Sequence, residues 1–289
     1  MKQEKLNAIL TLLEDPDDEV FGLVSRKLFD EGTEIVPDLE KAWETTLDER
    51  LQGRLENLIG DIQFNVLIKE FKDWLDSGYK DLVYGAFLVV KYQYPDLAFA
   101  SILEAIEKIR ADVWLEINNN LTALEKVRII NHIFYDIHGF SANTSNFYSP
   151  QNSYLNQVLE TKKGNSISLA IIYSNIAISL GIPIYGVNLP KNFILAYMDD
   201  FAFPKEEEVM FYINPFNKGA VLGKKEIDFF LNQQKIDPRE SFYKPCSNKE
   251  IIQRLILNLT YSYQNMGYKE KLKGLQQIND LFIQQKNEL

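Results

Sequence analysis

Short polar residues stand where a buried helix is predicted to begin. The segment Lys163-Gly164-Asn165-Ser166-Ile167-Ser168-Leu169-Ala170 is a polar turn that leads into nearly unbroken apolar sequence as far as Leu180. A helix that is apolar on almost every face is expected to be buried. Its first turn would place Asn165, Ser166 and Ser168 beside unpaired backbone N–H groups and the positive end of the helix dipole. This turn is therefore where the buried helix can present chemistry to a cleft.

Two segments predicted as strands follow this helix at short spacing. The helix should end before Gly181-Ile182-Pro183, and the strands should cover residues 184–197 and 209–217, with the acidic stretch from Met198 to Glu208 as a loop. A buried helix followed by an antiparallel strand pair is the layout of a papain/transglutaminase-like core, which carries a nucleophile at the helix start, a base on the next strand and a carboxylate on the strand after. We predict a predominantly helical α+β fold, in which helical segments flank a core of one buried helix and a small antiparallel sheet.

Five motifs in a fixed order resemble the SirB-type branch of the transglutaminase-like superfamily. They are Asn152-Ser153-Tyr154-Leu155-Asn156 with Val158-Leu159, Lys163 to Leu169, Gly181-Ile182-Pro183, Gly186-Val187-Asn188-Leu189-Pro190 and Asn214-Pro215-Phe216-Asn217. The resemblance covers the predicted helix start and both predicted strands.

Carried over position by position, the resemblance implies a degenerate catalytic triad. Active enzymes of this kind have Gly-x-Cys at the helix start, where this chain has Ser166; Asn192 stands at the position of the histidine and Asn214 at that of the aspartate. We call these three residues the triad positions. A serine hydroxyl needs a base to attack a substrate, and an amide cannot accept and later donate a proton near neutral pH. Covalent acyl transfer is therefore not expected.

Other residues are poorly placed to supply the missing nucleophile or base. The single cysteine, Cys246, lies well downstream, and the two histidines, His132 and His138, lie upstream of the core on or just after another helix. For His132 a partly buried structural role is favoured over a catalytic one. A hydrolase or amidase that used Ser166 or Ser168 with Lys191 as base is an alternative, although Lys191 should face away from Asn192 if both lie on a strand.

A polar loop before the helix supplies further candidate ligand-binding residues. The resemblance places residues 141–153 beside the active-site cleft, so Gln151, Asn152 and Tyr154 join Asn165, Ser166, Ser168, Asn192 and Asn214 as candidates. Gln151 or Asn152 could donate a hydrogen bond to a ligand oxygen. The favoured alternative is that they cap the helix that begins near Tyr154.

Helical patterns dominate the rest of the chain. We predict a helical region over residues 1–76, the core with its leading helices over 77–245, and a helix pair over 246–289. The segment from Leu12 to Val20 is similar to the turn between HEAT-type repeats. The helix pair over residues 246–289 resembles a single tetratricopeptide-like unit.

Composition excludes several classes of protein. The 289 residues carry a net charge of −10, which argues against nucleic-acid binding because that depends on many Lys and Arg contacts to phosphate. One cysteine and two histidines without ligand spacing predict no metal site, and no cofactor is expected. No run has the apolar length of a membrane span, and the N-terminus lacks a signal-peptide core, so we expect a cytoplasmic protein without a membrane partner.

Three functions fit these observations. The first is a non-catalytic transglutaminase-like protein that binds an unidentified peptide or protein as a binding, regulatory or scaffold module. The second is the serine-dependent hydrolase, amidase or acyl transferase described above. The third is a helical scaffold whose partner surface lies on the terminal helices.

Overall fold

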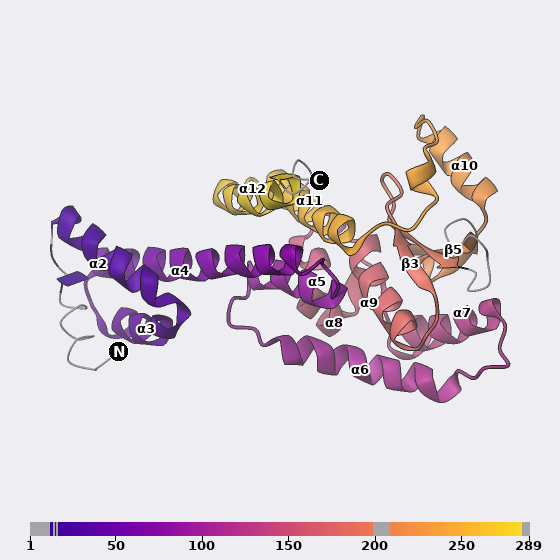
Figure 1. Cartoon of the computed structure of the whole chain (residues 1–289), viewed down its shortest axis with the longest axis horizontal. Helices are drawn as coiled ribbons and strands as arrows, with labels where there is room; N and C mark the ends of the chain where they lie inside the picture. Colours follow the sequence, from indigo (N-terminus) through magenta and orange to yellow (C-terminus); the bar gives the residue numbers. More distant parts are fainter. Residues whose placement is uncertain (1–11, 14, 16, 199–208, 285–289) are drawn as a thin grey trace. The chain divides into compact units, whose positions relative to one another are not determined.

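A computed structural model describes residues 12–13, 15, 17–198 and 209–284 of the chain. It divides into an N-terminal unit, Met1–Asp73, and a core unit, Trp74–Leu289. The fold is α+β and predominantly helical, as predicted (Figure 1). None of the described helices is long and apolar enough to cross a bilayer.

The described part of the N-terminal unit is helical, as the sequence of residues 1–76 predicted. Its elements are α2 (Asp18–Glu31), the 3-10 turn η1 (Gly32–Ile35), α3 (Val36–Thr45) and α4 (Glu49–Asp76). Asp17 caps α2 by accepting a hydrogen bond from the Glu19 N–H at 2.8 Å. The seam between these helices is apolar and includes Leu28, Leu39 and Leu55. The segment from Leu12 to Val20, which is similar to a HEAT-type turn, lies partly outside the described residues.

The core unit contains eight further α-helices and one π-helix among its described residues. Their bounds are α5 (Leu82–Lys91), α6 (Phe99–Glu116), α7 (Ala123–Asn131), α8 (Leu155–Thr161), α9 (Ser166–Ser179), α10 (Lys224–Gln233), α11 (Asn248–Met266) and α12 (Lys269–Gln284), with the π-helical η2 (His132–Ile137) continuing α7 as the ninth. Short 3-10 turns are η3 (Pro150–Ser153), η4 (Pro215–Asn217) and η5 (Glu240–Phe242).

Helix α9 is the centre of the core unit. Ten of its residues are buried, from Ile167 to Ala177, which agrees with the burial predicted from its apolar sequence. It packs against α5, α6, α8 and α11 as well as β3 (Ile184–Val187) and β4 (Ile194–Met198). Figure 1 shows α9 between these other helices and the strands. Helix α9 is therefore held from several sides, and α5, α6 and α11 among these elements are distant from it in sequence.

The sheet corrects the prediction of a single strand over residues 184–197. This segment is a hairpin of β3 and β4, which are joined by a turn at residues 188–193. Pro190 cannot donate a backbone hydrogen bond, and Lys191 has a left-handed φ of 64°, so the chain reverses where continuous strand was expected. The sheet continues with β5 (Val209–Asn214) and β6 (Ala220–Leu222) in the antiparallel order β3-β4-β5-β6.

Two short parallel strands and the last helix pair complete the core unit. Strands β1 (Ser141–Ala142) and β2 (Lys163–Gly164) pair just before α9. Helices α11 and α12 pack on each other, and α11 also packs on α5, α9 and η3. The break between α11 and α12 is at Gly267, whose left-handed φ of 78° ends α11. Both helices belong to the same compact unit as α9 and the sheet.

Candidate functional site

The start of α9 is closed by a reciprocal pair of hydrogen bonds. Asn165 is the N-cap, and its Oδ1 accepts from the Ser168 N–H at 2.9 Å while its own N–H donates to Ser168 Oγ at 3.1 Å. The Asn165 Nδ2 donates to Ser153 Oγ at 3.0 Å. Ser168 is fully buried. Two of the candidate binding residues, Asn165 and Ser168, are thus occupied in forming the helix terminus.

Ser166 is the first residue of α9, at the position predicted for the degenerate nucleophile. Its Oγ accepts a hydrogen bond from the Phe193 N–H at 3.3 Å. The hydroxyl therefore connects the helix start to the segment that leads into β4. Ser166 and Asn192 come from neighbouring segments of the fold, because Asn192 directly precedes Phe193.

Asn192 was expected on a strand but lies in the turn just before β4. Its N–H donates to the Leu189 carbonyl at 3.3 Å, and its partly exposed side chain forms no hydrogen bond with another described residue. The neighbouring Lys191 is exposed, and its Nζ donates to Gln234 Oε1 at 2.9 Å, just after α10. The strand alternation used to orient Lys191 does not apply in this turn.

Asn214 is the last residue of β5. Its Oδ1 accepts from the Phe216 N–H at 3.1 Å and so caps the 3-10 turn η4. The last pairing between β4 and β5 at this end is Leu195 with Ile213, so Asn192 and Asn214 both lie just beyond the same end of the strand pair. Helix α9 packs against both β4 and η4. The fold thus brings the three segments that carry the triad positions together.

No imidazole stands among these segments. His132 Nδ1 lies 3.1 Å from Asp136 Oδ2, and its side chain is 64% exposed, so the expectation of partial burial was wrong. His138 Nε2 lies 2.8 Å from Asp112 Oδ2 on α6. Both histidines therefore contact carboxylates outside the triad positions.

The single cysteine has an environment that suppresses thiol chemistry. Cys246 Sγ donates to the Gly186 carbonyl at 3.3 Å, and burial raises its pKa to about 12. A thiol with such a pKa is almost entirely protonated near neutral pH and is a weak nucleophile. Among the residues that the structure describes, no cluster of histidine, cysteine and carboxylate side chains could hold a metal ion.

The loop before α8 is held by Asn152, which is only 2% exposed. Its Nδ2 donates to the carbonyls of Asn146 and Phe147 at 2.8 and 3.0 Å, and its Oδ1 accepts from Asn143 Nδ2 at 2.8 Å. Both amide protons are thus used inside the loop, and Asn152 does not form the cap of α8 that was considered for it. Gln151 is exposed, and its Oε1 accepts from Ser149 Oγ.

Tyr154 is buried behind this loop. Its hydroxyl lies 2.9 Å from that of Tyr263 on α11, which donates in turn to Gln93 Oε1 at 3.2 Å. Burial is the main cause of the raised pKa of the Tyr154 hydroxyl, and the nearby Tyr263 adds to it. Tyr154 therefore joins α11 to the core and does not face solvent.

Exposed aromatic rings lie beside Asn214, and the sequence did not predict their assembly. Phe216 contacts Phe147 at a centroid distance of 5.9 Å, Phe147 contacts Tyr148 at 5.2 Å, and Tyr148 contacts Tyr261 of α11 at 5.8 Å. We call these four residues the aromatic row. Phe147, Tyr148 and Tyr261 are each about half exposed. Of these four residues, only Phe147 and Tyr148 are adjacent in the sequence, so only this pair could be recognised without the structure.

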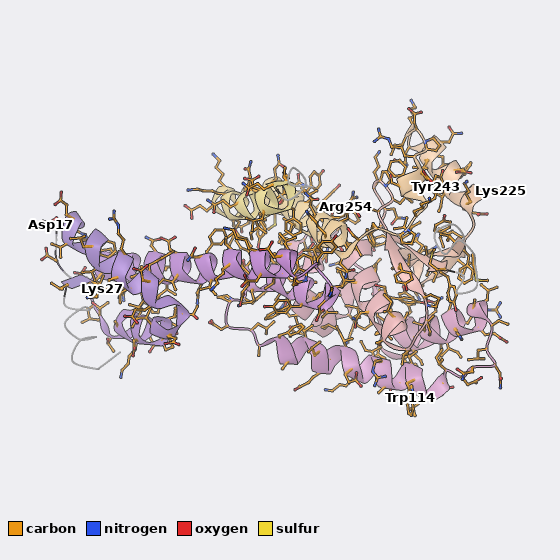
Figure 2. The ribbon with its side chains drawn as sticks, in the orientation of Figure 1. Asp17, Lys27, Trp114, Lys225, Tyr243 and Arg254 are labelled. Atoms are coloured by element: carbon orange, nitrogen blue, oxygen red, sulfur yellow. The ribbon has the colours of Figure 1, made fainter. Side chains whose placement is uncertain are left out.

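A pocket of about 730 Å³ lies elsewhere, between β5, α10 and the chain near η5. None of the triad positions lines it. Tyr243 stands in its wall, beside α10 in Figure 2, and donates to Asp228 Oδ1. It is a separate feature of the sheet's outer part.

Comparison with known proteins gives one family and several relatives. The sequence profile of the transglutaminase-like superfamily matches residues 100–257. A UPF0162 protein of Xylella fastidiosa (strain Temecula1) is 32% identical over 190 residues, which are 62% of this chain and 64% of the relative. UPF0162 protein YchA of Escherichia coli (strain K12) is 26% identical over 178 residues, 61% of this chain and 64% of the relative.

A relative from animals matches a longer part of the chain. Human F-box only protein 21 is 26% identical over 227 residues, which are 76% of this chain and 33% of that protein. The chain thus spans less than two thirds of the length of these relatives. No solved structure matches it.

Proposed function

We propose a binding function without acyl-transfer chemistry for this chain, which belongs to the transglutaminase-like superfamily. In this proposal it is a member of the SirB-type branch that acts as a binding, regulatory or scaffold module. The observation that carries the proposal is that the Ser166 hydroxyl accepts a backbone hydrogen bond from Phe193. The family resemblance assigns Asn192 and Asn214 to the positions of base and orienter.

The chemistry of the three side chains supports the loss of catalysis. An alkoxide at Ser166 would require a group that takes up its proton, and the amide of Asn192 is not basic near neutral pH. Asn214 could orient a neighbour by hydrogen bonding, but its Oδ1 already accepts from the Phe216 N–H. Each residue therefore keeps a polar contact or a polar surface while it lacks charge and basicity.

A serine hydrolase or acyl transferase that uses Lys191 has less support. The Lys191 amine is exposed and donates to Gln234 Oε1. A lysine acts as a general base only when burial or a nearby cation lowers its pKa, and an exposed turn supplies little desolvation.

The flanking helices suggest the class of partner. We propose that α11 and α12 form a single tetratricopeptide-like unit and that the N-terminal unit is HEAT-like, so that a peptide or protein is the natural ligand. The net charge of −10 disfavours nucleic acid as the partner.

Restoration of the triad tests whether the triad positions are correctly assigned. We expect the variant Ser166→Cys/Asn192→His/Asn214→Asp, made in a Cys246→Ser background, to fold and to carry a thiol whose pKa lies below the ordinary value of about 8.5. The pH dependence of alkylation by iodoacetamide measures that pKa. The matched control keeps Asn192 and Asn214 and changes only Ser166 to Cys. An equal thiol pKa in both variants would overturn the assignment.

A further inference from the structure

Arg254 on α11 is a partly buried cation without an ion-pair partner among the described residues. Its Nε is inaccessible to solvent and meets no hydrogen-bond acceptor in the part of the chain that the structure describes, and burial lowers the pKa of the guanidinium. Figure 2 labels Arg254 on α11. A buried donor without an acceptor costs about 1 to 3 kcal/mol. Such a group in a folded protein requires an explanation.

The carboxylate best placed to pair with Arg254 has another role. Glu250 lies four residues earlier on the same helix, a spacing at which ion pairs form readily. Its Oε2 instead accepts from the N–H and the Oγ of Ser247, both at 2.8 Å, and closes the capping box of α11. The residue four positions later is the neutral Asn258. The start of α11 is thus built in a way that leaves Arg254 unpaired.

The turn of α11 that precedes Arg254 packs beside the segment that carries Asn192 and Phe193. A Cβ added at Gly186 would come within 3.0 Å of side-chain atoms of both Phe193 and Ile251. Ile251, one turn before Arg254, therefore packs beside the residue whose N–H binds Ser166 Oγ. Helix α11 also packs on η3 and α9.

Arg254 and Tyr261 share one face of α11. Seven residues separate them, which is two helical turns and an axial distance of about 10 Å. Tyr261 is the end of the aromatic row, and the hydrogen bonds of Asn152 to Asn146 and Phe147 fix the loop that carries Phe147 and Tyr148. The cation and the rings are therefore present as a prearranged surface.

We propose that this surface binds an extended acidic peptide, with a carboxylate on Arg254 and an aromatic or proline side chain on the row of Tyr261, Tyr148, Phe147 and Phe216. The inference rests on the proposed binding function and names the ligand class.

An extended chain advances about 3.3 Å per residue, so the two anchors of the peptide should be about three residues apart. Because Nε is buried, a carboxylate would bind end-on to the pair of Nη groups of Arg254, and aromatic faces accept proline and aromatic side chains. A single carboxylate suits one unpaired cation on a chain of net charge −10, which repels a polyanion.

The test uses the full chain and a positional-scanning library of fluorescein-labelled hexapeptides with amidated C-termini. We expect enrichment of Asp or Glu about three positions from Phe, Tyr, Trp or Pro. Fluorescence anisotropy of the enriched peptide should show binding weakened about tenfold or more by Arg254→Gln, which removes the charge-assisted contact, and about threefold to tenfold by Tyr261→Ala. A peptide with Gln in place of its acidic residue should bind wild type and Arg254→Gln equally.

Matched controls separate this result from nonspecific effects. Arg239→Gln and Tyr185→Ala change an exposed arginine and an exposed tyrosine that are not part of the proposed peptide-binding surface. Both variants should leave the affinity for the peptide unchanged. Arg254→Gln should melt at the same temperature as wild type or higher, because it removes an unpaired, partly buried charge. Circular dichroism of each variant checks folding.

Three outcomes would overturn the inference. They are a library without enrichment, an enriched peptide whose affinity is indifferent to Arg254→Gln, and displacement of the peptide by single-stranded DNA or inorganic phosphate at equal concentration. The triad variant described above tests the proposed function by thiol reactivity alone, so failure of one experiment leaves the other interpretable.

Discussion

Asn165→Ala should destabilise the core unit, because Asn165 performs two structural tasks at the start of α9. Its Oδ1 satisfies the N–H of Ser168 at 2.9 Å, and its Nδ2 donates to Ser153 Oγ at 3.0 Å. Alanine removes both contacts and leaves the backbone conformation of the N-cap unchanged. Ser153 is only 1% exposed, so its hydroxyl would lose a partner that solvent cannot replace.

The expected loss is the sum of two terms. Replacement of an N-cap Asn by Ala costs about 1 kcal/mol. Loss of the buried contact with Ser153 adds about 1 to 2 kcal/mol, since an unsatisfied hydroxyl remains. The free energy of unfolding should therefore fall by about 2 to 3 kcal/mol, which for a unit of this size lowers the melting temperature by about 4 to 12 °C.

Two variants separate the terms when urea denaturation is followed by circular dichroism. Asn165→Asp keeps an acceptor for Ser168, can accept from the Ser153 hydroxyl and adds a favourable charge at the helix start, so it should stay within about 1 kcal/mol of wild type. Ser153→Ala alone should cost about 1 kcal/mol. A loss below about 0.5 kcal/mol for Asn165→Ala, or an equal loss for Asn165→Asp, would refute the capping role.

Two further variants probe the surroundings of the site. Burial raises the pKa of the Cys246 thiol from 9.0 to about 12. The thiol should therefore react with iodoacetamide at pH 8 about a thousandfold more slowly in the folded chain than in urea. Comparable rates in the two states would contradict its burial. Because the folded pKa is the higher one, this thiol should also lower stability as pH rises from about 9 to 12. Gly219→Ala should lower the free energy of unfolding, measured by urea denaturation, by about 2 to 3 kcal/mol. The φ of Gly219 is 69°, and the new Cβ would collide with the Asn131 side chain, which donates to the Gly219 carbonyl at 2.9 Å. An unchanged midpoint would contradict this expectation.

Local sequence patterns were sufficient for the helix that organises the core unit. The short polar residues at Asn165, Ser166 and Ser168, followed by continuous apolar sequence, predicted a capped and buried helix, and the structure has both features. A strand was also predicted over residues 209–217, and the structure has it as far as Asn214, after which Pro215–Asn217 form the 3-10 turn η4. These features depend on hydrogen bonds and side chains within a few residues.

Features that depend on the turn at residues 188–193, or on contacts between segments distant in sequence, were not predicted. The hairpin over residues 184–197 was taken as one strand, because Leu189 and Phe193 continue an apolar pattern through a turn whose left-handed residue is Lys191 instead of glycine. The contact of Tyr148 with Tyr261 joins segments more than a hundred residues apart. No periodicity within either segment encodes such a contact.

The isolation of Arg254 was equally hidden from sequence. The spacing of Glu250 and Arg254 would by itself predict an ion pair on the surface of α11. Only the competing contact of Glu250 with Ser247 shows that the carboxylate is committed elsewhere.

The central claim is that the start of α9 keeps the position of a nucleophile without its reactivity. Intact-mass measurement of the wild-type chain after incubation with a fluorophosphonate tests this most directly, with an active serine hydrolase in parallel to show that the reagent is competent. The hydroxyl of Ser166, bonded to the Phe193 N–H and without a base, should gain no adduct. A stoichiometric adduct that maps to Ser166 and disappears in Ser166→Ala would contradict the claim.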